Sequence, residues 1–213
     1  MINLDYQAAY QYSKEEMEQL KSLRIKYGRH YQNTYGQSKK RVWYDGEVKS
    51  TAIKHEIIKH LLLATRFRCV YCMKLLARSE KPVDHFINNA AHPKYSFHPL
   101  NLVPSCGFCN SSLKGSYEVL ATKGTKYHDH VFKIVHPIIH NVDAHIIYLD
   151  ATKKTIDYNA CSVEGKETIR LFDLRSLEMS MERLSQHAME TLFPIDDATL
   201  LQLVVDTATY KPK

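Results

Sequence analysis

The sequence predicts an α+β protein in which a metal-stapled segment lies between mainly helical flanks. Two pairs of cysteines, each pair separated by two residues, indicate the staple. Apolar residues at helical spacing occur before and after these pairs, and short β-like runs follow the second pair. With 213 residues, the chain is long enough to bury one core of ordinary size.

The N-terminal flank, residues 1–66, is predicted to be helical and basic. Residues 13–16, Ser-Lys-Glu-Glu, form a capping-box pattern that opens a helix running to about Tyr27, where Gly28 is expected to stop it. A second helix is predicted from residue 50 to residue 67, because isoleucine and leucine side chains fall on one face and lysine and histidine side chains on the other.

The segment between these two helices combines cations with aromatic rings. Lys39, Lys40 and Arg41 precede Tyr44 and Trp43, and Trp43 is the one tryptophan of the chain. Such a segment either grips a nucleic-acid strand by charge and stacking or is a loop anchored by its aromatic side chains. The pattern alone leaves both interpretations open.

The C-terminal flank, residues 131–213, is predicted to be mixed and then helical. Short β-like runs occur at residues 144–149 and 155–158, and apolar spacings of three and four predict helices within residues 166–193. A last helix is predicted from about residue 197 to residue 207. No internal repeat or low-complexity linker divides the flank.

Charge is unevenly distributed along the chain. Lys and Arg number 20 against 11 Asp and Glu over residues 1–130, but 9 against 12 over residues 131–213. The basic residues 1–130 would suit binding to a phosphate polyanion, although an ordinary solvated surface can have the same charge bias. The acidic C-terminal flank is better suited to contact with a protein. Without a long apolar run or a signal-peptide pattern at the start, we expect a cytoplasmic protein with no membrane contact.

Four of the five cysteines are expected to hold a structural zinc ion. Cys69, Cys72, Cys106 and Cys109 supply four thiolates, the number that a closed tetrahedral site needs, with 33 residues between the two pairs. A thiol–disulfide pair is the alternative, but it needs one pair at a helix start in a βαβ unit, whereas here two equivalent pairs flank an insertion. Cys161 is expected to be a buried apolar side chain.

The insertion and the end of the second cysteine pair carry further polar residues, which are, in chain order, Asp84, His85, Asn101, Asn110 and Lys114. Together with the cysteine pairs, this order resembles the zinc-containing HNH nuclease motif, the treble-clef-like ββα-metal finger, over residues 69–114. The resemblance implies an HNH finger at residues 67–130 that hydrolyses phosphodiester bonds. It departs from the family in one place, because the proline that often follows Asp-His is absent from Phe86–Asn89.

The chemistry of phosphodiester hydrolysis assigns roles within this motif. His85 is the candidate general base, since an imidazole can take a proton from water near neutral pH. Asp84 and Asn110 offer oxygen ligands for a catalytic Mg²⁺ or Mn²⁺ ion. Asn101, by the resemblance, fixes the loop that carries the base, and Lys114 is expected one helical turn after Asn110, where its ammonium could meet a phosphate.

The flanks resemble a narrower group, the HNH effectors of the PtuB type in bacterial anti-phage systems. This looser resemblance implies an ATPase partner of the PtuA type, as in Septu systems, and in some retron systems a reverse transcriptase with its nucleic acid. Residues 131–213 would then be the docking region for the ATPase. A different class of protein, a zinc-dependent nucleic-acid-binding or scaffold module without catalysis, remains the alternative.

Overall fold

The computed structural model describes residues 1–32, 43, 48–76 and 83–192, together with residues 194, 196, 199 and 202; for residues 24–32 and 48–51 it describes the backbone alone. The basic residues 39–41 therefore lie outside the described residues, and of the helix predicted at 197–207 the described residues 199 and 202 are both helical. None of the described helices is long and apolar enough to cross a membrane.

The described part of the chain is a mixed α/β structure with two small antiparallel sheets. The helices are α1 (Lys14–Gln32), α2 (Val48–Ala64), α3 (Val142–His145), α4 (Val163–Leu171) and α5 (Leu177–Leu192), and the strands are β1 (Val83–His85), β2 (Leu102–Pro104), β3 (Leu120–Thr122) and β4 (Val131–Phe132). β1 pairs with β2, and β3 pairs with β4. Short helical turns named η1 (Tyr6–Ala8), η3 (Pro93–Tyr95), η4 (Pro99–Asn101), η5 (Phe108–Lys114) and η6 (Tyr127–Asp129) connect these elements.

The predicted start of α1 is confirmed, and its predicted end is wrong. The backbone N–H of Glu16 donates to Ser13 Oγ over 3.2 Å, and the N–H of Ser13 donates to Glu16 Oε2 over 2.8 Å, which is the reciprocal pair of a capping box. The helix continues through Gly28 to Gln32. A glycine inside a helix costs about 1 kcal/mol relative to alanine, so it weakens the helix without ending it.

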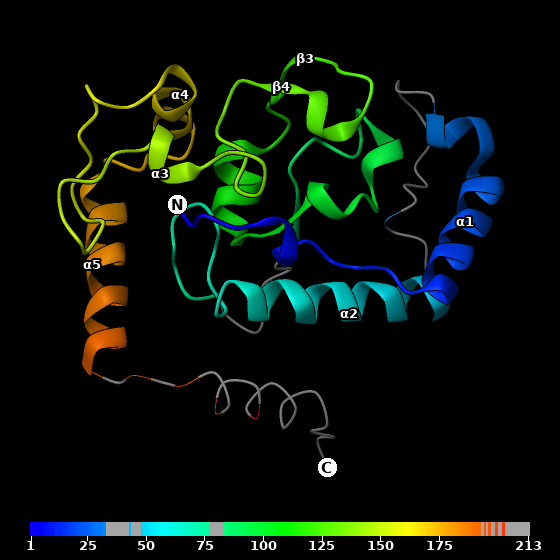
Figure 1. Cartoon of the computed structure of the whole chain (residues 1–213), viewed down its shortest axis with the longest axis horizontal. Coiled ribbons are helices and arrows are strands. Elements are labelled where there is room, and N and C mark those ends of the chain that lie inside the picture. Colours follow the sequence, from blue (N-terminus) through cyan, green and yellow to red (C-terminus); the bar gives the residue numbers. More distant parts are fainter. Residues whose placement is uncertain are drawn as a thin grey trace.

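The apolar face predicted for α2 is buried. Ile53, Ile57 and Leu61 are each at most 2% exposed and form a small core together with Leu20 of α1 and Leu102 of β2. α2 lies along one side of the central part of the molecule, with α1 at one end and α5 at the other (Figure 1). The cluster places α2 directly against β2, and α1 packs on α2.

The two strands predicted near residues 144–158 are largely wrong. Val142–His145 forms the short helix α3, and pairing is limited to one isolated bridge between Tyr148 and Ile156. The Asp150 carboxylate accepts backbone N–H groups at residues 154 and 155 and closes the turn between the two runs. The helices expected after this region are present as α4 and α5.

A larger core surrounds the four cysteines. It contains aromatic side chains from distant parts of the sequence: Tyr71, Phe86, Phe132 and Phe172 are all at most 2% exposed. Tyr71 stacks on Phe172, just after α4, with ring centroids 4.0 Å apart. The C-terminal helices are therefore packed on the same core as the cysteine pairs.

Candidate metal centre and histidine site

The four predicted cysteines come together as one buried cluster. Each is at most 2% exposed, and their sulfur atoms all lie within 4.8 Å of one another. The Sγ atoms of Cys72 and Cys106, one from each pair, are 3.8 Å apart. A tetrahedral zinc ion with Zn–S bonds of about 2.3 Å separates its sulfur ligands by about 3.8 Å, so the arrangement fits zinc.

Tight turns present the thiols from each pair. In the first, the backbone N–H of Cys69 donates to Lys74 O over 2.8 Å, and that of Met73 donates to Cys69 O over 2.9 Å. In the second, the N–H of Cys109 points to Cys106 Sγ at 3.4 Å. None of the five cysteines forms a disulfide, and Cys161 is buried as predicted but lies outside the cluster.

A short hairpin and a helix follow the first cysteine turn in the chain. β1 pairs with β2 so that Asp84 faces Val103 and His85 faces Leu102 in register. After β2 and the second cysteine turn, η5 runs from Phe108 to Lys114 with π-helical hydrogen bonding, including Gly115 N–H to Asn110 O at 2.9 Å. The chain therefore runs from β1 to β2 to η5, and the polar residues predicted for the site lie on or next to these three elements.

His85 is the last residue of β1 and is 9% exposed. Its Nε2 lies 3.0 Å from the carbonyl oxygen of Ser96. Because a carbonyl can only accept, Nε2 carries the proton in this bond, and the lone pair of the neutral imidazole is on Nδ1. The Trp43 ring packs against the imidazole edge to face, with ring centroids 4.7 Å apart.

Asp84 bonds a different set of partners. Its carboxylate is 2% exposed and accepts from Tyr71 Oη over 2.7 Å and from Lys114 Nζ over 2.8 Å. Lys114, itself 3% exposed, also donates to the backbone carbonyl of His85 over 2.9 Å. Burial, followed by the negative charge of Asp84, raises the pKa of Tyr71 well above its usual value, so the phenol remains a donor.

Asn101 is the most completely bonded side chain of the site. Its Oδ1 accepts from the Ile87 N–H over 2.7 Å and from Tyr127 Oη over 2.8 Å. Its Nδ2 donates to Ile87 O over 3.1 Å and to Tyr95 O over 3.0 Å. The amide is 0% exposed, and the two bonds to Ile87 hold the segment just after His85 against Asn101.

The five predicted residues therefore lie on adjoining elements but do not share one set of contacts. Asp84 and Lys114 bond each other, His85 bonds Ser96, and Asn101 bonds the loop after β1. Asn110, half-buried on η5, donates its Nδ2 to Val83 O over 3.3 Å. Lys114 is turned into the protein instead of toward solvent.

Tyr71 and Trp43 are contacts of the site that sequence reasoning did not assign. Tyr71 is one of the two residues between Cys69 and Cys72, and no spacing rule predicts that an aromatic residue in such a turn bonds Asp84. Trp43 was considered for nucleic-acid contact, but nothing in the sequence places it beside His85. Both contacts depend on tertiary packing.

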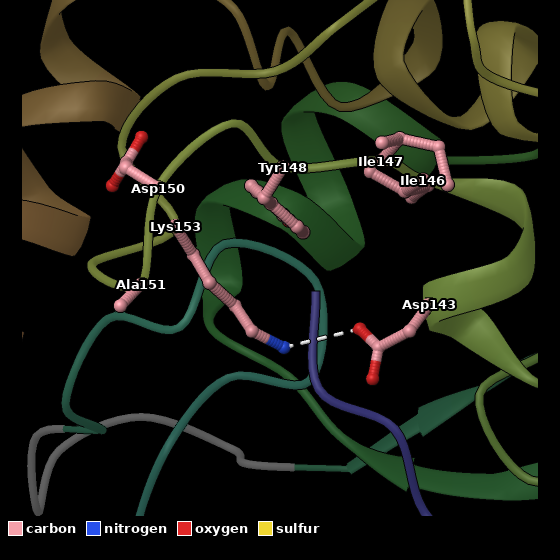
Figure 2. A pocket seen from close by; sticks show the side chains of 7 residues that line it. All are labelled: Asp143, Ile146, Ile147, Tyr148, Asp150, Ala151 and Lys153. Atoms are coloured by element: carbon pink, nitrogen blue, oxygen red, sulfur yellow. Dashed lines mark hydrogen bonds and ion pairs between the residues drawn. The ribbon is translucent and has the colours of Figure 1, made fainter.

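A shallow pocket lies away from these residues, between α3 and the turn that follows it. It has a volume of about 280 Å³ and is lined in part by Tyr148, Asp143 and Lys153. Figure 2 shows the Lys153 ammonium reaching toward the Asp143 carboxylate, and these groups are 3.2 Å apart. The pocket contains none of the residues that the sequence predicted for catalysis or metal binding.

The fold and the cysteine cluster define a mixed α/β protein whose four buried thiols are compatible with a zinc ion. Among the residues that the structure describes, these cysteines are the one group of three or more His, Cys, Asp or Glu side chains close enough to hold a metal.

No protein-family model matches the chain. The chain is similar to protein ea31 of Escherichia phage lambda, with 35% identity over 79 residues, which is 37% of this chain. The match spans 23% of the length of the phage protein. It is therefore a partial similarity and assigns no family.

Proposed function

We propose that the protein is an HNH endonuclease that hydrolyses phosphodiester bonds in DNA or RNA. The observation that carries the proposal is the setting of His85: it ends β1, its Nε2–H is tied to Ser96 O, and Asn101 fixes the segment that follows. The succession of β1, β2 and η5 beside a four-cysteine cluster supports a zinc-stapled ββα-metal finger.

In this proposal His85 removes a proton from the attacking water. The hydrogen bond to Ser96 leaves the lone pair on Nδ1, and an imidazole is basic enough to act near neutral pH. Asn101 is a positioning residue, because its bonds hold the backbone next to His85 instead of reaching a reacting atom. Low exposure around His85 limits competing water.

A catalytic Mg²⁺ or Mn²⁺ between Asp84 and Asn110 does not fit the arrangement as it stands. Both oxygens of Asp84 already accept strong donors, and the Lys114 ammonium supplies the positive charge that a cation would bring. The requirement for a divalent ion therefore rests on the resemblance to HNH nucleases alone. For the same reason, contact between Lys114 and a phosphate would require Lys114 to leave its present partners.

The proposal assigns zinc a structural role. Four buried thiols within one cluster leave no ligand position open to a substrate, which is typical of structural and not of catalytic zinc. We place the protein in the cytoplasm, where thiols remain reduced.

We further propose that an ATPase subunit of the PtuA type docks on the C-terminal region, in an anti-phage system that can include a retron reverse transcriptase. Supporting this, α5 exposes large apolar side chains: Leu177, Met181, Met189 and Leu192 are 78%, 47%, 54% and 69% exposed. Exposed apolar residues gathered on one helix are typical of a surface that binds another protein.

The bonding of Asp84 favours a second candidate, a nucleic-acid-binding or scaffold module without catalysis. The Asp84 carboxylate of β1 is hydrogen-bonded to Tyr71 of the first cysteine turn and to Lys114 of η5. These bonds connect the three segments, which is a purely structural role. The retained His85 at the end of β1 is not explained by that role.

Replacement of His85 distinguishes the two candidates. His85→Ala is expected to retain zinc and folding while abolishing cleavage of DNA and RNA pools in Mg²⁺ or Mn²⁺, because the base is lost. The matched control is His128→Ala, since His128 is an exposed histidine whose imidazole pairs with Asp129. Cleavage by His85→Ala at the wild-type rate would refute the assignment, and binding without cleavage by the wild-type protein and its ATPase partner would favour the scaffold module.

A further inference from the structure

Trp43 lies directly beside the proposed base. Its ring centroid is 4.7 Å from that of His85, at an interplanar angle of 88°, and 5.0 Å from that of Phe97. The side chain is neither fully buried nor fully exposed. An indole with some surface open to solvent is therefore part of the immediate surroundings of the imidazole.

A cation accompanies this ring. Lys54 of α2 donates its Nζ proton to the backbone carbonyl of Trp43 over 3.0 Å, and the ammonium is 5.9 Å from the ring centroid. Lys54 and Trp43 together place a positive charge beside an aromatic ring. Proteins that bind single-stranded nucleic acids have the same combination in their binding grooves.

The geometry of hydrolysis puts a nucleotide in the same place. A water activated by His85 lies about 3 Å from the ring nitrogen, and the phosphorus that it attacks lies about 3 Å further on. The nucleosides attached to that phosphorus must pass next to any group that touches His85. In a duplex the base faces are covered by their neighbours, so an indole at this position can stack only on an unpaired base.

We propose that Trp43 stacks on a base adjacent to the cleaved phosphodiester, and that the substrate is unpaired at the cut site. The inference rests on the proposed nuclease function and specifies its substrate class, a single strand or an unpaired loop of DNA or RNA. Lys54 contributes by holding the backbone of Trp43 and by adding positive charge near the strand.

The one tryptophan of the chain makes the contact directly measurable. Emission of the wild-type protein, titrated without added Mg²⁺ or Mn²⁺, is expected to be quenched saturably by 12-nucleotide oligo(dT) or oligo(U), and much less by a 12-base-pair duplex. Comparison of the two oligonucleotides distinguishes DNA from RNA as the source of the unpaired base. Because the assay detects binding alone, it remains readable if no cleavage occurs, and failure of the proposed function is thereby separated from failure of this inference.

Variants test whether the stacking contributes to affinity. Trp43→Ala is expected to bind the single-stranded oligonucleotide about tenfold more weakly, measured by anisotropy of a labelled strand, and Trp43→Phe to lose less because it can still stack. Tyr6→Ala removes an exposed ring outside the site and should leave affinity unchanged. The proposal would be overturned if the duplex quenched the emission equally, or if Trp43→Ala bound the single strand with unchanged affinity. Faster cleavage by Trp43→Ala would also overturn it, because Trp43 would then be a cover over His85.

Discussion

The buried pair of Lys114 and Asp84 gives the sharpest test of the structure. Lys114→Met keeps a long side chain but removes the ammonium, which leaves the Asp84 carboxylate, 2% exposed, with Tyr71 as its remaining donor. Breaking a buried ion pair by removing one partner costs about 3–5 kcal/mol, because an uncompensated charge stays inside the protein. For a chain of this length, that loss lowers the melting temperature by about 6–20 °C.

Thermal unfolding followed by circular dichroism, with zinc content measured in parallel, checks this estimate. The double variant Asp84→Asn/Lys114→Met removes both charges and is expected to be more stable than Lys114→Met, because no unpaired charge remains and the amide oxygen can still accept from Tyr71. The matched control is Lys21→Met, since Lys21 and Glu18 form an exposed pair with side chains 62% and 70% accessible. That control should change stability by at most about 0.5 kcal/mol.

Two outcomes would refute the reasoning. If Lys114→Met unfolds within a degree or two of the wild-type protein, the ammonium is not the counter-ion of Asp84. If the double variant is less stable than Lys114→Met, the cost does not come from a stranded charge. Zinc content that stays stoichiometric in every variant shows that the effect arises in the pair itself and not in the cysteine cluster.

Further predictions concern the metal centre and acid stability. Cys106→Ser is expected to abolish stoichiometric zinc and to unfold the segments around the cysteine cluster, whereas Cys161→Ser, which lies outside the cluster, should retain one zinc per chain by elemental analysis. Burial lowers the pKa of His136 well below its usual value, and its Nδ1 accepts the N–H groups of Ile138 and Ile139, both over 3.2 Å. The unfolded chain therefore takes up this proton first as the pH falls below about 6.5, so stability present above that pH is lost below it. His136→Asn, whose amide oxygen can accept the same N–H groups, should reduce the fall in melting temperature between pH 6.5 and 5, and an unchanged slope would contradict the assignment.

Local sequence signals predicted the features that depend on neighbours in the chain. The capping box at Ser13 opens α1, and the spacing of apolar residues predicts the buried face of α2, because both signals operate over one or two turns. Predictions were less successful where a weak local signal was outweighed by the packing of the rest of the chain. Gly28 did not stop α1, and of the strand expected at 144–149, residues 144 and 145 lie in α3 while Tyr148 keeps one bridge to Ile156.

The site shows the same division. The spacing of the cysteines predicted the zinc-compatible cluster, since each pair forms a turn and four thiolates are the number that a closed tetrahedral zinc site needs. The partners of Asp84 and Lys114 were not predictable in this way. Whether a carboxylate binds a cation from solution or a lysine from its own chain depends on which group packing brings within about 3 Å.

The sequence by itself determined which residue types are available: four thiols at metal-binding spacing, an Asp-His pair, two asparagines and one lysine in a fixed order. Only the tertiary structure decided how they are used. It buried Lys114 against Asp84, turned the Tyr71 phenol onto the same carboxylate, and set Trp43 against His85. The physical reason is that spacing constrains only side chains held by the same turn or strand, whereas charges buried between distant segments are paired by whatever the folded core brings into contact.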